Sequence, residues 1–198
     1  MQKNHKWSMS FRLWHWIHAG VVLGLLGTVF LRKTFLSWRD NSQILTEQLS
    51  QINIEVTQAQ AKVLAKAIRS PMWEWHILLG YALGALLLWR ITLFFSQSGT
   101  YNYQHFKTKS LHKKLVTLGY IAIYILLAFM TISGYIIHFY QDLGLLKTTA
   151  HDIKEIHELL YTGVLIFVPL HIIGIFIAEN RDEQGLISDM VHGGEENS

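Results

Sequence analysis

The chain is organised around four long runs of apolar residues that are separated by polar segments. These runs lie near residues 12–31, 73–95, 113–138 and 155–178. Each is long enough for a helix to cross the hydrocarbon core of a bilayer, which takes about 20 residues. Within lipid, a helix satisfies its own backbone hydrogen bonds. The pattern therefore predicts an all-α integral membrane protein, a four-helix bundle in which residues 1–198 form one domain.

The polar segment 32–72, between the first two runs, is predicted to contain short helices of its own. The stretches "DNSQ" at 40–43 and "TQAQ" at 57–60 each place a capping residue three positions before glutamine, a pattern typical of helix starts. The second is followed by apolar residues on one helical face: Val63, Leu64, Ala67 and Ile68. We expect two amphipathic helices over the outer ends of the bundle, as a lid or spacer, or alternatively as a docking surface.

Composition supports a membrane protein and narrows its chemistry. Hydrophobic residues make up 51% of the chain and charged residues only 16%, which is less charge than a soluble domain carries. Cysteine is absent, which excludes disulfides, thiolate metal sites, iron–sulfur clusters and covalent c-type haem attachment. A bound metal would have to use carboxylates or some of the 11 histidines. The net charge of +3 is spread along the chain and indicates no nucleic-acid partner.

Four spans place both termini on the same side of the membrane. The first run follows Lys3, Lys6 and Arg12 and lacks a signal-peptidase cleavage pattern at its end, so we interpret it as a retained helix. The short basic loop at 96–112 favours an inner location for both termini, because short cytoplasmic loops are enriched in lysine and arginine.

Several histidines lie inside the spans, where ionisable groups are rare and usually functional. Sorting them by depth gives two layers. The outer layer contains His76 and His157, with His138 at a span end. The inner layer contains His15, His18 and His171, with His112 at a span end. The remaining histidines are interpreted as ordinary polar residues: His5, His105, His151 and His192.

The spacing on the fourth run favours two separate centres. His157 and His171 are fourteen residues apart, so they share one helical face but lie about 21 Å apart along the axis. One metal ion cannot bind both, whereas two centres could each take a second histidine at equal depth from the first or second run. Two neutral imidazoles on one iron are typical of b-type haem. Depth alone does not choose between His15 and His18.

Two arginines share faces with these histidines. Arg12 lies one turn before His15, and Arg90 lies fourteen residues after His76. Haem propionates are carboxylates that need cationic partners, so both arginines are candidate propionate ligands. The alternative for Arg90 is extension of its charged end to the membrane interface.

The motifs that carry these residues resemble one superfamily. "RLWHW" at 12–16, "WEWHILLGY" at 73–81 and the two histidines of the fourth run are similar to the four-helix b-type cytochromes. These comprise prokaryotic cytochrome b561, the cytochrome b subunits of nickel–iron hydrogenases and the gamma subunits of formate dehydrogenases. The resemblance covers nearly the whole chain, through "AENRDEQGLISDMVHGG" at 178–194.

The resemblance implies two haem b groups and electron exchange with membrane quinones. The family's arginine–x–x–histidine–tryptophan motif falls on Arg12, His15 and Trp16, which selects His15 over His18. The implied ligand pairs are His15 with His171 for the inner haem iron and His76 with His157 for the outer one. It also implies a cytoplasmic tail, 179–198, and an extracytoplasmic loop, 32–72, although this loop is long for the short cytochrome b561 members.

We therefore expect a multi-pass cytochrome of the cell inner membrane, in contact with lipid, that transfers electrons between the quinone pool and a redox protein subunit of a respiratory chain. Loop 32–72 could then form part of a quinone pocket. One alternative is a quinone-coupled oxidoreductase that acts directly on a small substrate such as superoxide. Another is a non-redox transporter or scaffold. The sequence leaves open whether the chain is itself an enzyme, and its oligomeric state.

Overall fold

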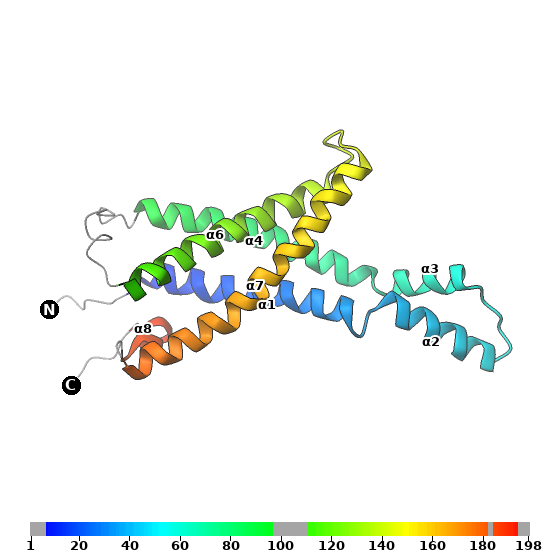
Figure 1. Cartoon of the computed structure of the whole chain (residues 1–198), viewed down its shortest axis with the longest axis horizontal. Helices are drawn as coiled ribbons and strands as arrows, with labels where there is room; N and C mark the ends of the chain where they lie inside the picture. The colour runs from blue at the N-terminus through cyan, green and yellow to red at the C-terminus, as the bar shows by residue number, and fades with distance from the viewer. Residues whose placement is uncertain (1–6, 97–110, 182–183, 194–198) are drawn as a thin grey trace. The chain divides into compact units, whose positions relative to one another are not determined.

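The computed structural model describes residues 7–96, 111–181 and 184–193, with only the backbone for 111–113, and this part of the chain is helical without β-strands (Figure 1). Its helices are α1 (Met9–Lys33), α2 (Trp38–Gln51), α3 (Gln58–Ile68), α4 (Ser70–Ser96), α6 (Leu111–His138), α7 (Lys147–Arg181) and α8 (Leu186–Val191). The contacts group into two compact units. Unit one contains Met1–His18 and Leu83–Ser198, and unit two contains Ala19–Ala82.

Four of the described helices, α1, α4, α6 and α7, are long and apolar enough to cross a membrane, which confirms the predicted all-α fold with four spans. Large apolar side chains point outward along them: Leu88, Ile125, Leu159 and Phe176 are each more than half exposed. A soluble protein does not leave apolar surface of this extent facing water. Lipid contact accounts for it.

Helix α7 begins eight residues before the predicted span, at Lys147 rather than near 155. Its first turns are polar and carry ion pairs between residues four apart, Lys154–Glu158 at 2.9 Å and His151–Glu155 at 3.5 Å. Such pairs support a helix in water. Hydropathy marks only the apolar part of a helix, and for that reason this polar extension was missed.

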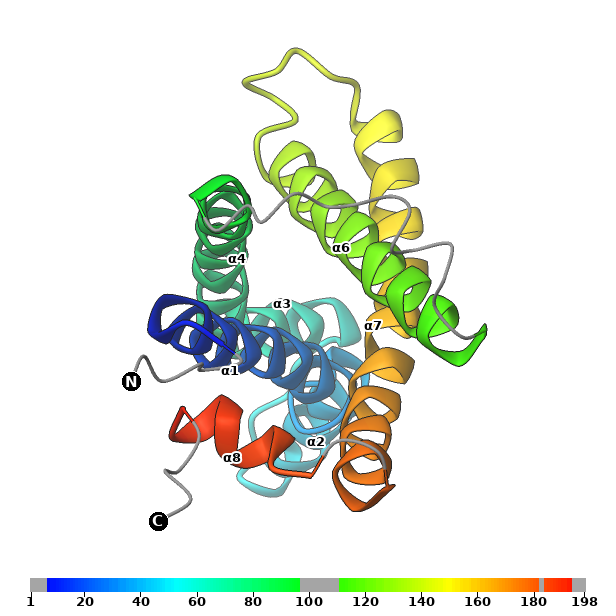
Figure 2. The ribbon, with the colours of Figure 1, turned by 90° about the vertical axis from the view of Figure 1, so that its left-hand side faces the viewer.

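Unit one is held together by close approaches at small residues and by one buried indole. Helices α6 and α7 lie side by side in both views (Figures 1 and 2). A Cβ at Gly163 would lie only 2.9 Å from a methyl carbon of Leu126, so glycine permits this packing. Trp14 is 2% exposed, and its Nε1 donates a 2.7 Å hydrogen bond to the carbonyl of Leu86, which joins α1 to α4.

Unit two carries the two short helices predicted between the first spans. Helices α2 and α3 pack against each other, with Ala61 and Ala65 of α3 fully buried. Within this unit the pair continues beyond the end of α1, roughly in line with it, and does not fold back across the helix ends (Figure 1). The hairpin of α2 and α3 is therefore a projecting element of unit two.

Only one of the two predicted capping boxes forms. Thr57 is the N-cap of α3: its hydroxyl accepts from the Gln60 backbone nitrogen, and the Gln60 side chain accepts from the Thr57 nitrogen, as predicted. The cap predicted at Asp40 is wrong: α2 begins at Trp38, and its N-cap is Ser37, three residues before Asp40. Asp40 lies in the first turn instead, where a negative charge favours the helix dipole.

Replacing Thr57 with alanine tests the capping box. We expect a loss of about 1 kcal/mol of local stability, because the Gln60 amide at the start of α3 loses the hydroxyl that accepts from it. Hydrogen exchange of the amides in Gln58–Ile68 should then be about fivefold faster. Ser50→Ala is the matched control, since the Ser50 hydroxyl only donates to the Glu47 carbonyl within α2. Equal exchange in the two variants would contradict the assigned cap.

Candidate functional site

Helices α1 and α7 bring the rings of two of the predicted ligand histidines close together. The rings of His15 and His171 have their centroids 6.2 Å apart with their planes inclined by 57°. Imidazoles that bind one metal ion from opposite sides, each with a metal–nitrogen bond of about 2 Å, have centroids about 6 Å apart. The spacing fits an iron ion between the two rings, and we call these residues the inner pair.

Aromatic rings contact both histidines of the inner pair. Phe167 lies one turn before His171 on α7 and stacks on it at 5.7 Å, and Tyr120 of α6 meets the same ring edge-on at 6.0 Å. Trp16 contacts His15 edge-on at 5.4 Å. Planar apolar walls of this kind suit a flat macrocycle and keep water from its ligands.

His18, which depth alone could not distinguish from His15, has a different environment. Its ring stacks on Trp14 at 4.8 Å. The Nε2 atom of His18 is buried and has no hydrogen-bond partner within the described residues. The structure thus places the ring of His15 beside that of His171, whereas the ring of His18 stacks on Trp14.

The two histidines of the predicted outer layer lie in different units, and each is held by a hydroxyl group. In unit two, the Nδ1 atom of His76 lies 2.7 Å from the hydroxyl oxygen of Thr28. In unit one, the Nδ1 atom of His157 lies 2.8 Å from the hydroxyl oxygen of Ser133. We call His76 and His157 the outer pair, and their pairing stays a prediction. Neither hydroxyl group was predicted from the sequence.

Arg90 is held by aromatic rings. Its Nε donates to the hydroxyl of Tyr124 at 3.2 Å. Its guanidinium lies over the rings of Phe11, Trp14 and Tyr124, at 5.1, 5.6 and 5.7 Å from their centroids. Such cation–π contacts stabilise a cation away from water. A propionate contact for Arg90 stays a prediction.

Arg12 and Trp16, which flank His15, hold the end of helix α8. An Arg12 Nη atom donates to the Val191 carbonyl at 3.3 Å, and Trp16 Nε1 donates to the Met190 carbonyl at 3.1 Å. The Nε atom of Arg12 is buried without a hydrogen-bond partner in the described chain. The C-terminal segment therefore lies against the start of α1 (Figure 2).

A carboxylate fixes the other end of α8. Glu179, near the end of α7, accepts hydrogen bonds of 2.9 Å from the backbone nitrogens of Gly185 and Ile187. Gly185 has φ = 83° and Gly193 has φ = 90°, values that favour glycine, so the chain can turn sharply on both sides of the helix. The glycines were visible in the sequence, but the docking of this tail was not predicted.

The other described histidines have contacts of different kinds. His138 meets Phe139 edge-on at 4.6 Å, and His151 pairs with Glu155. His192 caps the end of α8. His5, His105 and the side chain of His112 lie outside the described residues.

A family model described as prokaryotic cytochrome b561 matches residues 6–193. The chain belongs to this family. As a family member it is a multi-pass membrane cytochrome of b type that takes part in electron transfer and binds haem b. No curated protein and no solved structure matches the chain.

The residues present fit the haem b that the cytochrome b561 family implies. Nowhere in the described chain do three or more histidine or carboxylate side chains converge as a metal site. Haem iron needs only two axial side chains, because the porphyrin supplies its other ligands. The inner pair offers two imidazoles at the right separation, beside aromatic walls.

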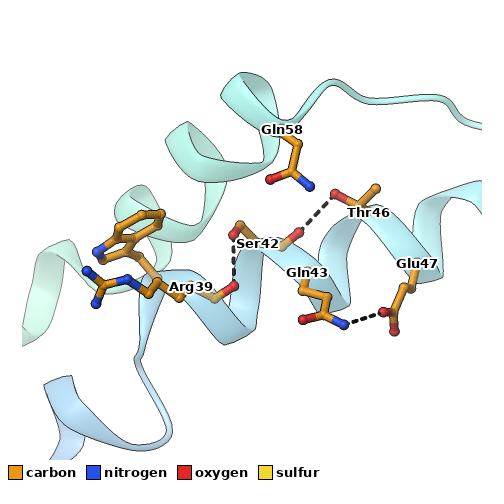
Figure 3. Close-up of a pocket in the computed structure, with 7 residues that line it drawn as sticks. Arg39, Ser42, Gln43, Thr46, Glu47 and Gln58 are labelled. Carbon is orange, nitrogen blue, oxygen red and sulfur yellow. Dashed lines mark hydrogen bonds between the residues drawn. The ribbon is translucent and has the colours of Figure 1, made fainter.

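A shallow groove on the hairpin of α2 and α3 has no histidine pair that could bind haem iron. Its labelled lining residues are Arg39, Ser42, Gln43, Thr46, Glu47 and Gln58 (Figure 3). Several of them bond within α2: Ser42 donates to the Arg39 carbonyl, Thr46 to the Ser42 carbonyl and Gln43 to Glu47. Trp38 at its edge carries Arg39 and Lys62 over its ring, at 4.9 and 4.7 Å from the centroid.

Glu179→Ala should release α8 from the membrane helices. Two backbone amides lose their carboxylate partner, at a cost of about 1 kcal/mol, so tryptic cleavage after Arg181 should be about fivefold faster. Glu155→Ala on the same helix is the control, because its pair with His151 is exposed. A cleavage rate that is the same in both variants would show that the Glu179 cap does not hold α8.

Proposed function

We propose that this cytochrome binds two haem b groups and carries electrons between membrane quinones and a redox protein partner. The observation that carries the proposal is the close placement of His15 and His171, with ring centroids 6.2 Å apart. The same helix α7 carries His157 fourteen residues earlier, about 21 Å along the axis. One helix with candidate ligands at two depths supports two centres, and His76 would complete the outer one.

His15 and His171 would hold the haem iron, and their aromatic neighbours would exclude water. When bound, haem supplies one-electron chemistry between ferric and ferrous iron. Trp16, Tyr120 and Phe167 provide a wall of low polarity around the imidazoles. Burial of this kind is one means by which proteins set a haem potential.

Arg12 and Arg90 are the proposed partners of haem propionates. Arg12 lies one turn before His15, and its buried Nε has no partner in the described chain. This leaves it a donor for a carboxylate. Arg90 uses Nε for Tyr124, and no hydrogen bond of its terminal nitrogens occurs among the described residues. Each guanidinium could therefore bind an anion without giving up the contacts described above.

We place the protein in the cell inner membrane, with both termini and tail 179–198 in the cytoplasm and loop 32–72 outside. The basic segment 96–112, which connects α4 to α6 in the sequence, supports this orientation through the positive-inside rule. Quinone, which is dissolved in the membrane, would exchange electrons near one haem. The redox partner would meet the other.

Haem content of histidine variants tests the ligand assignment. His15→Ala and His171→Ala should each lose the same haem, because each removes one axial ligand of the inner centre. His157→Ala should lose the other haem and leave the inner one. His18→Ala, matched in residue type and one turn from His15, should retain both. The measurement is the pyridine haemochrome content per polypeptide together with the reduced-minus-oxidised spectrum.

Two results would contradict the ligand assignment. One is the loss of different haems from the His15 and His171 variants. The other is a wild-type protein with one haem or none.

Electron exchange with quinone has a separate test. A quinol analogue added to the oxidised, detergent-purified protein should raise the b-type absorption band, because the proposed role includes equilibration with quinones. Dithionite defines full reduction. Reduction by dithionite but by no quinol would remove quinone from the proposal and leave the haem sites intact.

A further inference from the structure

Each histidine of the outer pair has its own hydrogen bond to a hydroxyl group, an arrangement that the described residues do not show for the inner pair. On α1, the hydroxyl of Thr28 donates to the Leu25 carbonyl at 2.6 Å and lies 2.7 Å from His76 Nδ1. On α6, the hydroxyl of Ser133 donates to the Phe129 carbonyl at 2.7 Å and lies 2.8 Å from His157 Nδ1. The same arrangement thus occurs twice, on different helices.

The number of protons on each hydroxyl group and each imidazole determines which atom donates in these hydrogen bonds. A hydroxyl group has one proton, and a carbonyl oxygen can only accept, so the contact of each hydroxyl with a carbonyl of its own helix requires that proton. The hydroxyl oxygen must then accept at its other contact, so Nδ1 of the histidine carries hydrogen and donates it. In a neutral imidazole of this tautomer, Nε2 carries the lone pair. His76 and His157 are therefore both set to bind a metal ion through Nε2.

Because both hydroxyl groups are buried, their hydrogen bonds can strongly affect the ligand histidines. Ser133 is 2% exposed and Thr28 is 7% exposed, so water does not readily replace either hydroxyl. A ligand histidine whose second nitrogen has a fixed acceptor keeps its ring orientation and becomes a more basic ligand. A more basic ligand stabilises ferric relative to ferrous iron and so lowers the reduction potential.

The inner pair has a different environment. Within the described residues, neither His15 nor His171 forms a hydrogen bond to a serine or threonine hydroxyl, and aromatic rings surround both. The chain therefore distinguishes its two candidate centres by the contacts of the imidazoles, although all four ligands are histidine. A difference in these contacts is a means of giving two haems different potentials.

We propose that Thr28 and Ser133 are positioning residues that hold His76 and His157 in the Nδ1–H tautomer and lower the potential of the outer haem alone. The inference rests on the proposed outer pair. Neither residue touches the iron; each acts through the histidine to which it is hydrogen-bonded.

The experiment compares Ser133→Ala and Thr28→Val with wild type by redox titration of the two haems and by electron paramagnetic resonance of the ferric protein. Each variant should raise the outer haem potential and leave the inner one unchanged. A tenfold change in the relative affinity for ferric and ferrous iron, at the low end for loss of such a partner, corresponds to about 59 mV for one electron. The ferric signal of the outer haem should also shift, because the imidazole loses its fixed orientation.

Matched variants separate this role from a general packing effect. Thr131→Val removes a hydroxyl from α6 two residues from Ser133, where it only donates to the Leu127 carbonyl, and should leave both potentials unchanged. Ser133→Thr and Thr28→Ser keep the hydroxyl and should restore wild-type potentials. Loss of the outer haem from Ser133→Ala and Thr28→Val, with retention in the three matched variants, would equally support positioning.

Two results would overturn the proposal: an outer potential that stays unchanged in both Ser133→Ala and Thr28→Val, or the same change in Thr131→Val. Failure of the proposed function is distinguishable from these results. It would appear as a wild-type protein without two haems, or as a His157→Ala variant that keeps both.

Discussion

The constraint that shapes this structure is the cost of placing polar side chains inside helices that face lipid. A buried polar group without a hydrogen-bond partner is destabilising, and the hydrocarbon core contains no water to supply one. The chain meets this constraint mainly with its own backbone. Trp14 donates to the Leu86 carbonyl, and the hydroxyls of Thr28 and Ser133 donate to carbonyls one turn earlier in their helices. A carbonyl in a helix has a second lone pair, so these bonds leave the helix intact.

The charge of Arg90 is stabilised in a different way from the uncharged polar groups. Arg90 lies within a helix that can span the membrane, and three aromatic rings contact its guanidinium. Aromatic faces attract a cation without presenting a fixed negative charge. A carboxylate in their place would neutralise the arginine and compete with any anionic group of a cofactor. The contacts with aromatic rings instead keep the positive charge of Arg90 available to an anion in an apolar region.

The sequence predicted the parts of this fold that depend on long patterns. Four apolar runs predicted four helices, because crossing lipid requires a minimum length that few other elements match. Boundaries and caps were less predictable. The start of α7 at Lys147 depends on local ion pairs, and Asp40 was assigned as a cap that the structure does not use. The docking of α8 was missed because its contacts with Arg12 and Trp16 join residues more than 170 positions apart.

In the candidate site, too, residue spacing predicts some features, whereas others depend on contacts with neighbouring helices. Fourteen residues between His157 and His171 indicated two depths on one face. Spacing could not choose His15 over His18, since the two lie one turn apart; the family motif favoured His15, and the structure places that ring beside that of His171.

Nor could spacing identify Thr28 or Ser133, because each lies in an apolar run and becomes significant only through a histidine on another helix. Side chains that contact such histidines can therefore be identified only from the packing of the helices in the structure. Candidate ligands that recur at fixed depths can be proposed from sequence.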